Sequence, residues 1–177
     1  MTKPTDNHEL ILDEIVGVLR GVDPKTQARL MAAISSAKRI YVAGCGRSGL
    51  MARAFAMRLM HLGCTAYVVG ETTTPAIGKR DLLLVCCGKG EKETLAVYMS
   101  QAAKAGARCA AITSERGSTI AKLADIVVVL PIRKTKQFGG SLFEQALLVF
   151  LDAVVMELMK KTRATKSQMK KRHANLE

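Results

Sequence analysis

The stretch from Tyr41 to Phe55 reads YVAGCGRSGLMARAF, and it decides the fold class of the chain. It begins with a short apolar run, continues through a glycine-rich turn and ends in a helical pattern. Gly44, Gly46 and Gly49 have the spacing G-x-G-x-x-G. After a strand and before a helix, this spacing is typical of a turn whose backbone N–H groups bind a phosphate. The stretch predicts an α/β sheet with an anion site at a helix start.

Short apolar runs alternate with helical stretches along most of the chain. The runs are RIYVAG, TAYVVG, DLLLVCC, ARCAAIT and DIVVVLP, at 39–44, 65–70, 81–87, 107–113 and 125–131. We expect helices near 48–62, 91–105, 118–124 and 141–161. Near-continuous apolar strands separated by helices indicate a parallel sheet covered on both faces. The pattern predicts a three-layer α-β-α sandwich with a doubly wound sheet of five strands.

Two helices are expected before the first strand. The segment NHELILDEIVGVLRGV, at 7–22, has apolar residues at helical spacing. Asp23 and Pro24 then provide an N-cap and a proline at the first helical position of a second helix. We therefore divide the chain into a helical pair at 1–37, an α/β domain at 38–162 and a basic C-terminal tail at 163–177.

The formal net charge of +12 is unevenly distributed. Residues 160–177 contain seven Lys or Arg against one acid, a pattern typical of a solvated helix end and tail. Only 4% of residues are aromatic and no nucleic-acid-binding module is visible, so we expect no nucleic-acid partner. A basic protein instead suits an anionic small substrate, because its field concentrates such ligands.

The chain shows no targeting, membrane or metal-binding pattern. Residues 1–7 are polar, and no apolar run approaches the roughly 20 residues that span a bilayer, so we expect a cytoplasmic protein without membrane contact. The five cysteines include no C-x-x-C pair, and the three histidines are scattered. This distribution argues against a disulfide framework and against a metal site.

A second glycine-bearing loop distinguishes two interpretations of the first. The dinucleotide interpretation would use Glu71, which lies about 20 residues beyond the glycines, as the ribose-binding acid. However, CCGKGEKET at 86–94 also follows a strand and opens a helix. Two such loops after the first and third strands would converge on one crevice, which suits a sugar phosphate. Arg47 and Ser48 add charge and a hydroxyl at the first loop.

From Ala43 to about Leu158 the chain resembles the sugar isomerase (SIS) domain family, most closely its 6-phospho-3-hexuloisomerase branch. The resemblance rests on GCGRSGLMARAFAMRLMHLG, YVVGETTTPAI, AAITSERGSTIAKLAD and GSLFEQALLVFLDAVV, at 44–63, 67–77, 110–125 and 140–155. It implies that 38–162 form a flavodoxin-like SIS domain, assembled as a homotetramer without metal or organic cofactor.

The resemblance also implies an activity. The expected reaction interconverts 3-hexulose 6-phosphate and fructose 6-phosphate in the ribulose monophosphate pathway, which fixes formaldehyde. Functional coupling to 3-hexulose-6-phosphate synthase would follow from that pathway. Two alternatives stay open: another SIS sugar-phosphate isomerase, such as one for arabinose 5-phosphate, and a non-catalytic sugar-phosphate binding module.

The resemblance assigns ligand contacts to both loops and to the end of the second strand. In the family the second loop usually reads S-G-S-G-E-T, whereas here a thiol and two ammonium groups replace its hydroxyls. A lysine binds phosphate as a point charge, with less directionality than a fixed fork. The expected phosphate and substrate contacts are Gly46, Arg47, Ser48, Cys87, Gly88, Lys89, Gly90, Glu91, Lys92, Glu71 and Thr72.

Two residues are expected to carry the proton transfers. The resemblance makes Glu144 the base, although the spacing Ser141-x-x-Glu144 is also that of a capping box. The partner acid is His61, which otherwise reads as a histidine at a helix C-terminus, where the dipole favours a cation. Related isomerases borrow a histidine from a neighbouring subunit, so His61 would act across an interface.

Overall fold

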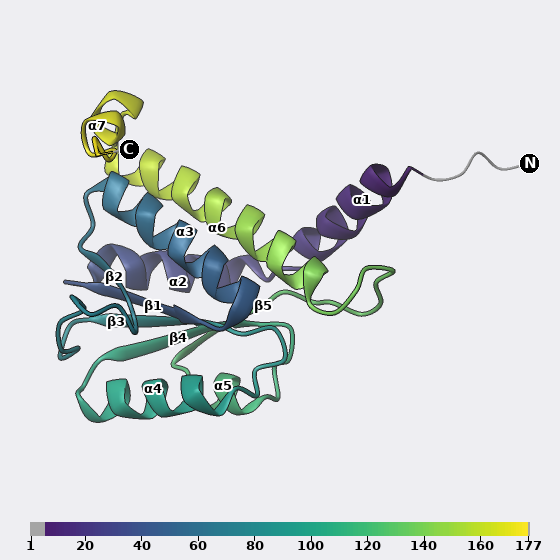
Figure 1. The fold of residues 1–177 in the computed structure, drawn as a ribbon, viewed down its shortest axis with the longest axis horizontal. Helices are drawn as coiled ribbons and strands as arrows, with labels where there is room; N and C mark the ends of the chain where they lie inside the picture. Colours follow the sequence, from purple (N-terminus) through teal and green to yellow (C-terminus); the bar gives the residue numbers. More distant parts are fainter. Residues whose placement is uncertain (1–5, 177) are drawn as a thin grey trace, which may run out of the picture.

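The computed structural model describes residues 6–176, and Figure 1 shows its layered arrangement. The strands are β1 (Ile40–Gly44), β2 (Ala66–Val68), β3 (Leu82–Cys86), β4 (Arg108–Thr113) and β5 (Ile126–Val129). The helices are α1 (Asn7–Arg20), α2 (Pro24–Ser36), α3 (Gly46–Leu62), α4 (Glu93–Lys104), α5 (Thr119–Lys122), α6 (Ser141–Thr162) and α7 (Lys166–Lys171). Within 6–176, no helix is both long and apolar enough to cross a bilayer.

The five strands form one parallel sheet in the order β2-β1-β3-β4-β5, which confirms the flavodoxin-like expectation. In the register, Gly44 on β1 pairs with Cys86 on β3, and Cys86 pairs with Ile112 on β4. The carboxyl ends of these three strands therefore meet at one edge. The sheet order reverses direction between β1 and β3, and such a point is where open α/β sheets bind ligands.

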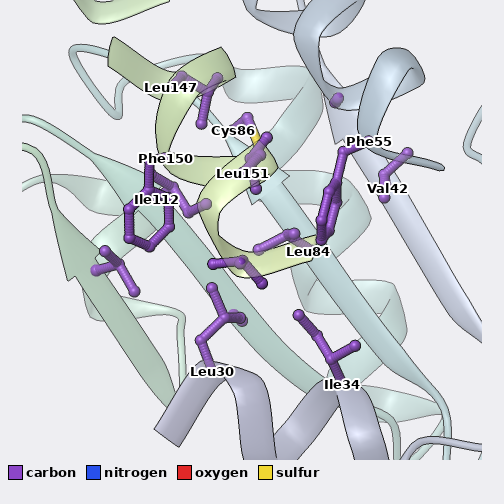
Figure 2. Packing of buried hydrophobic residues seen from close by; sticks show 14 of the residues in the cluster. Leu30, Ile34, Val42, Phe55, Leu84, Cys86, Ile112, Leu147, Phe150 and Leu151 are labelled. Carbon is purple, nitrogen blue, oxygen red and sulfur yellow. The ribbon is translucent and has the colours of Figure 1, made fainter. Parts of the chain in front are cut away.

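Helices cover both faces of the sheet, as Figure 1 shows. On one face α2, α3 and α6 pack over the strands, and Figure 2 shows Leu30, Phe55 and Phe150 from these helices around the strand residues. On the other face α4 and α5 cover a second cluster that includes Leu95 and Ile120. The three-layer sandwich is thus confirmed, and both faces of the central strands are buried.

The helix boundaries differ from the expected ones by a few residues at the two glycine loops. Helix α3 begins at Gly46, two residues earlier than expected, whereas α4 begins at Glu93, two residues later. Asp23 caps α2 as expected, because its Oδ1 accepts from the N–H of Lys25 at 3.0 Å. The later start of α4 leaves Glu91 and Lys92 in the second loop, beside the crevice.

Part of the segment expected as a basic tail is folded. Helix α7 begins with a capping box between Thr165 and Gln168. Beyond it, Arg172 donates a hydrogen bond of 3.1 Å to the backbone oxygen of His61 at the C-terminal end of α3. A guanidinium at a helix C-terminus is favoured by the helix dipole. This contact and the packing of Met169 against the main core hold α7 beside α3.

Two glycines let α3 leave β1 at close range. A Cβ on Gly49 would lie 2.6 Å from the backbone oxygen of Gly44, and a Cβ on Gly44 would lie 2.9 Å from the Cα of Gly49. Both obstacles are backbone atoms, which cannot rotate away. The third glycine of the motif therefore sets the distance between helix and strand, and with it the position of the first loop.

We expect Gly49→Ala to lower the free energy of unfolding by about 2 kcal/mol, since overpacking exceeds the helix-propensity gain of alanine. Urea denaturation measures the change. Gly17→Ala is the matched control, because Gly17 lies inside α1 with no atom within 4 Å of its added Cβ. It should raise stability by up to about 1 kcal/mol. Equal effects of the two substitutions would contradict the close-contact role of Gly49.

Candidate active site

A cavity of ≈ 340 Å³ lies beyond the carboxyl ends of β1 and β3. Both glycine loops and the first turn of α6 form its wall. The lining residues are Cys45, Ser48, Cys86, Cys87, Gly88, Lys89, Glu91, Lys92, Gly140, Phe143 and Glu144. The strand order thus brings together two loops that lie about forty residues apart in the chain.

The first loop presents the N-terminus of α3 to this cavity. Gly46 has φ +56°, a left-handed conformation that turns the chain from β1 into the helix. Among the described residues no side chain caps α3, so its first-turn N–H groups stay available to a ligand. The hydroxyl of half-buried Ser48 adds a donor at the same place. The arrangement is suited to binding an anion.

The second loop is held against β4 by the backbone oxygen of Gly88. This oxygen accepts hydrogen bonds from Thr113 Oγ1 at 2.9 Å, Ser114 Oγ at 2.8 Å and the Ser114 N–H at 2.9 Å. Gly90 has φ +69°, and a Cβ there would lie 2.1 Å from Ser118 Oγ. The loop therefore has one fixed path, and glycine is required where it passes Ser118.

The charged residues of the second loop divide into two kinds. Lys89 and Lys92 are exposed at the cavity, where their ammonium groups favour an anion. Glu91 instead accepts from Thr119, at 2.6 Å from its hydroxyl and 3.0 Å from its N–H. These two bonds hold the pKa of Glu91 below its usual value. A carboxylate repels phosphate, so we infer that Glu91 fixes the loop to α5.

Glu144 lies on the first turn of α6 and faces the cavity. The capping box that its spacing allows is not formed, because Gly140 is the N-cap and Ser141 already belongs to the helix, without a side-chain cap bond. The carboxylate instead forms an ion pair with Arg47, whose Nε lies 2.6 Å from Glu144 Oε2. Oε2 is buried and accepts no hydrogen bond from the described residues. The ion pair thus holds the carboxylate at the wall of the cavity.

Three predicted site residues lie away from the cavity. Glu71 and Thr72 follow edge strand β2 and are exposed, and Glu71 forms an ion pair with Arg53. His61 is buried at the opposite end of α3 from Ser48, roughly 20 Å away at about 1.5 Å per residue. Its ring stacks on that of His173, with 5.0 Å between centroids. Within one chain these residues do not join Glu144, and their roles stay predictions.

The SIS domain family model matches residues 33–156. The chain belongs to the SIS domain family. This confirms the resemblance seen in the sequence, and the cavity lies within the matched part, between the two glycine loops and Glu144.

Relatives named 3-hexulose-6-phosphate isomerase align with nearly the whole of this chain. A protein from Mycobacterium gastri named 3-hexulose-6-phosphate isomerase is 44% identical over 98% of this chain and 91% of its own length. A protein of the same name from Bacillus subtilis is 39% identical, over 99% of this chain and 100% of its own. A crystal structure of a protein from Methanococcus jannaschii superimposes with a TM-score of 0.89 at 37% identity, and the match covers 97% of this chain and 99% of that one. For that protein, a molecular function of 3-hexulose-6-phosphate isomerase was inferred from its structure.

Sequence reasoning missed four lining residues of this SIS site: Cys45, Cys86, Gly140 and Phe143. The register of β1 and β3 places Cys86 at the inner end of the cavity, where burial raises the pKa of its thiol to about 12, whereas the exposed Cys45 is the N-cap of α3. Gly140 and Phe143 both precede the predicted base Glu144 within one helical turn, so their closeness to it in the chain was the available signal. Among residues 6–176, no group of three or more His, Cys, Asp or Glu is arranged to hold a metal ion.

Proposed function

We propose that this chain interconverts 3-hexulose 6-phosphate and fructose 6-phosphate. The observation that carries the proposal is the Glu144 carboxylate, which shares one cavity with the first turn of α3 and the second glycine loop. The cavity thus combines an anion site with a base. The names of the full-length relatives at 39–44% identity point to the same reaction.

The phosphate would bind between the starts of α3 and α4. Both helices lack a side-chain N-cap among the described residues, so their N–H groups and the positive ends of their dipoles face the crevice. Ser48 supplies a hydroxyl, while Lys89 and Lys92 supply charge in place of the family's hydroxyls. This charge compensates for the lost directional donors.

The chemistry requires a proton to move between neighbouring carbons. With the ketone at carbon 3, Glu144 removes the proton from carbon 2, and an enediol(ate) forms across carbons 2 and 3. The same carboxylic acid returns its proton to carbon 3, and the hydroxyl proton moves from the oxygen of carbon 2 to that of carbon 3. This leaves the ketone at carbon 2, with no net change in oxidation state. A single positioned carboxylate serves both steps.

Arg47 supports this base in the proposed mechanism. Its guanidinium lies beside Glu144 Oε2 and carries the positive charge of the ion pair. When Glu144 takes a proton, that charge faces the developing enediolate, which it stabilises. Arg47 therefore stabilises the carboxylate before the transfer and the oxyanion after it.

We further propose a homotetramer in the cytoplasm, working in the ribulose monophosphate pathway together with 3-hexulose-6-phosphate synthase. His61 would then serve as the acid only if a neighbouring subunit brings it to the cavity, because its own chain holds it at the far end of α3. For that role, His173 and Arg172, which contact His61 at the end of α3, must either move away or leave room for the neighbouring subunit. Light scattering coupled to size-exclusion chromatography measures the number of subunits in the assembly.

A coupled assay on purified protein tests the proposed activity. Production of fructose 6-phosphate from 3-hexulose 6-phosphate is the expected result, and its absence at high enzyme concentration would overturn the proposal. Thermal shifts with fructose 6-phosphate, arabinose 5-phosphate and NAD separate the ligand classes, since a ligand of the native state raises the Tm. The largest shift should come from fructose 6-phosphate.

Lys89→Ala should raise the KM for the sugar phosphate about 5-fold with little change in kcat, because the substrate and the transition state carry the same phosphate. Steady-state kinetics at fixed ionic strength measures both constants. The matched control is Lys104→Ala, which removes the same charge from the exposed last turn of α4. An unchanged KM in Lys89→Ala would show that this ammonium does not bind the phosphate.

A further inference from the structure

The loop 131–140, from β5 to α6, leads directly into the candidate active site. Its last residue, Gly140, lines the active-site cavity and is the N-cap of α6. A Cβ on Gly140 would lie 3.3 Å from Glu144 Oε1, so the loop end and the carboxylate are in near contact. Any displacement of this loop end therefore moves the wall against which Glu144 rests.

Ile132, at the start of this loop, packs against the main core, but packing contributes little to the position of residues 133–140. The side chain of Phe138 is 94% exposed, and residues 139 and 140 are exposed as well. A second cavity of ≈ 470 Å³ lies between the loop and α1, lined in part by Gly17, Pro131 and Arg133. Figure 1 shows the loop at the start of α6, near α1. Polar contacts must therefore fix the path of residues 133–140.

Those polar contacts converge on Glu14 of α1. Its Oε2 accepts from Thr135 Oγ1 at 2.7 Å and from Gln137 Nε2 at 2.9 Å, while its Oε1 accepts from the Lys136 N–H at 2.9 Å. Among the described residues, the hydrogen bonds that join 131–138 to α1 all end on this carboxylate. They hold the pKa of Glu14 below its usual value.

Helix α1, which carries Glu14, is itself held in place by packing. Its Val18 is buried in the main core, and the helix packs along α6. The same pair of helices is thus joined twice, by apolar packing and by the loop that Glu14 binds. A carboxylate on a packed helix provides acceptors at fixed positions, and an exposed loop that donates to them is held in one conformation.

We propose that Glu14 is a positioning residue for the isomerisation: it fixes loop 131–140 and, through Gly140, the orientation of the Glu144 carboxylate. The inference rests on the proposed function of Glu144 as the base. Glu14 touches no substrate, so its effect is on the geometry of proton transfer. Small misplacements of a reacting group cost up to about 10²-fold in rate.

The test compares Glu14→Ala and Glu14→Gln with Asp13→Ala, which removes a charge from the exposed neighbouring position of α1. Glu14→Ala should lower kcat about 10-fold, with a change in KM below about 2-fold. Glu14→Gln should restore part of kcat, because its amide oxygen still accepts from the loop. Asp13→Ala should match the wild-type protein in both constants.

Amide hydrogen exchange gives a second readout that needs no turnover. In Glu14→Ala, exchange at Lys136, Gln137 and Ser141 should rise at least about 10-fold, while the strands keep their protection. Unchanged exchange, or faster exchange with unaltered kcat, would overturn the proposal. An inactive wild-type protein would refute the proposed function instead, and the exchange comparison would still decide whether Glu14 fixes the entry of α6.

Discussion

Glu144→Gln is expected to lower kcat by about 10³-fold, the typical contribution of a general base. The amide keeps the size of the side chain but cannot accept the proton from carbon 2. It also removes the negative charge beside Arg47, whose guanidinium then faces the cavity without its ion-pair partner. The phosphate site is unchanged, so KM should alter much less than kcat. Steady-state kinetics with 3-hexulose 6-phosphate measures both constants.

Glu157→Gln is the matched control, because it makes the same substitution on the same helix, outside the cavity, where a half-exposed carboxylate pairs with Lys160. Its activity should equal that of the wild-type protein. A Glu144→Gln variant that retained full kcat would remove the assigned base and the proposed mechanism with it. A variant that lost activity together with its thermal transition would show a folding defect, and the control at Glu157 separates the two outcomes.

Asp81→Asn is expected to lower the free energy of unfolding by about 3 kcal/mol, which is the low end for breaking a buried ion pair. The Asp81 side chain is fully buried, and it accepts from Arg39 at 3.1 and 2.6 Å and from the Gly78 N–H at 2.8 Å. Asparagine keeps one acceptor oxygen but directs an NH₂ group at the guanidinium. The low end applies because Arg39 is 26% exposed and regains water.

The same pair predicts the acid dependence of stability. Burial alone would raise the pKa of Asp81, but hydrogen bonds from Arg39 and Gly78 outweigh it, so the pKa lies below its ordinary value of 3.8. The stabilisation is therefore complete above pH 3.8 and is lost as pH falls through the lowered folded pKa. Urea midpoints from pH 6 to pH 2 should converge for wild-type and Asp81→Asn protein. Asp152→Asn, at an exposed site on α6, is the matched control for the loss of one carboxylate.

The sheet was predictable because parallel strands buried on both faces read as continuous apolar runs. The sequences LLLVC at β3 and IVVV at β5 are typical of buried strands, and turn residues lie on either side of each run. The strand order came from the resemblance, and the register then placed both glycine loops at one edge. What the apolar pattern left open were the ends of the helices, which depend on individual hydrogen bonds.

The site was less predictable wherever one residue had two possible partners. Ser141-x-x-Glu144 satisfies the rule for a capping box, yet in the fold Arg47 pairs with the carboxylate, and only tertiary structure brings that charge near. Glu91 similarly finds Thr119, a partner 28 residues away. Glu14 and its loop are separated by more than 120 residues, so no local pattern marks them.

The three hydrogen bonds to the Gly88 oxygen have a consequence for the kinetics of association. They order the second loop when the chain folds, so the entropy lost in fixing its backbone does not oppose substrate capture. An incoming sugar phosphate meets donors that are already preorganised and has only its own freedom to lose. Association should accordingly proceed in one kinetic phase, without a slow conformational step of this loop.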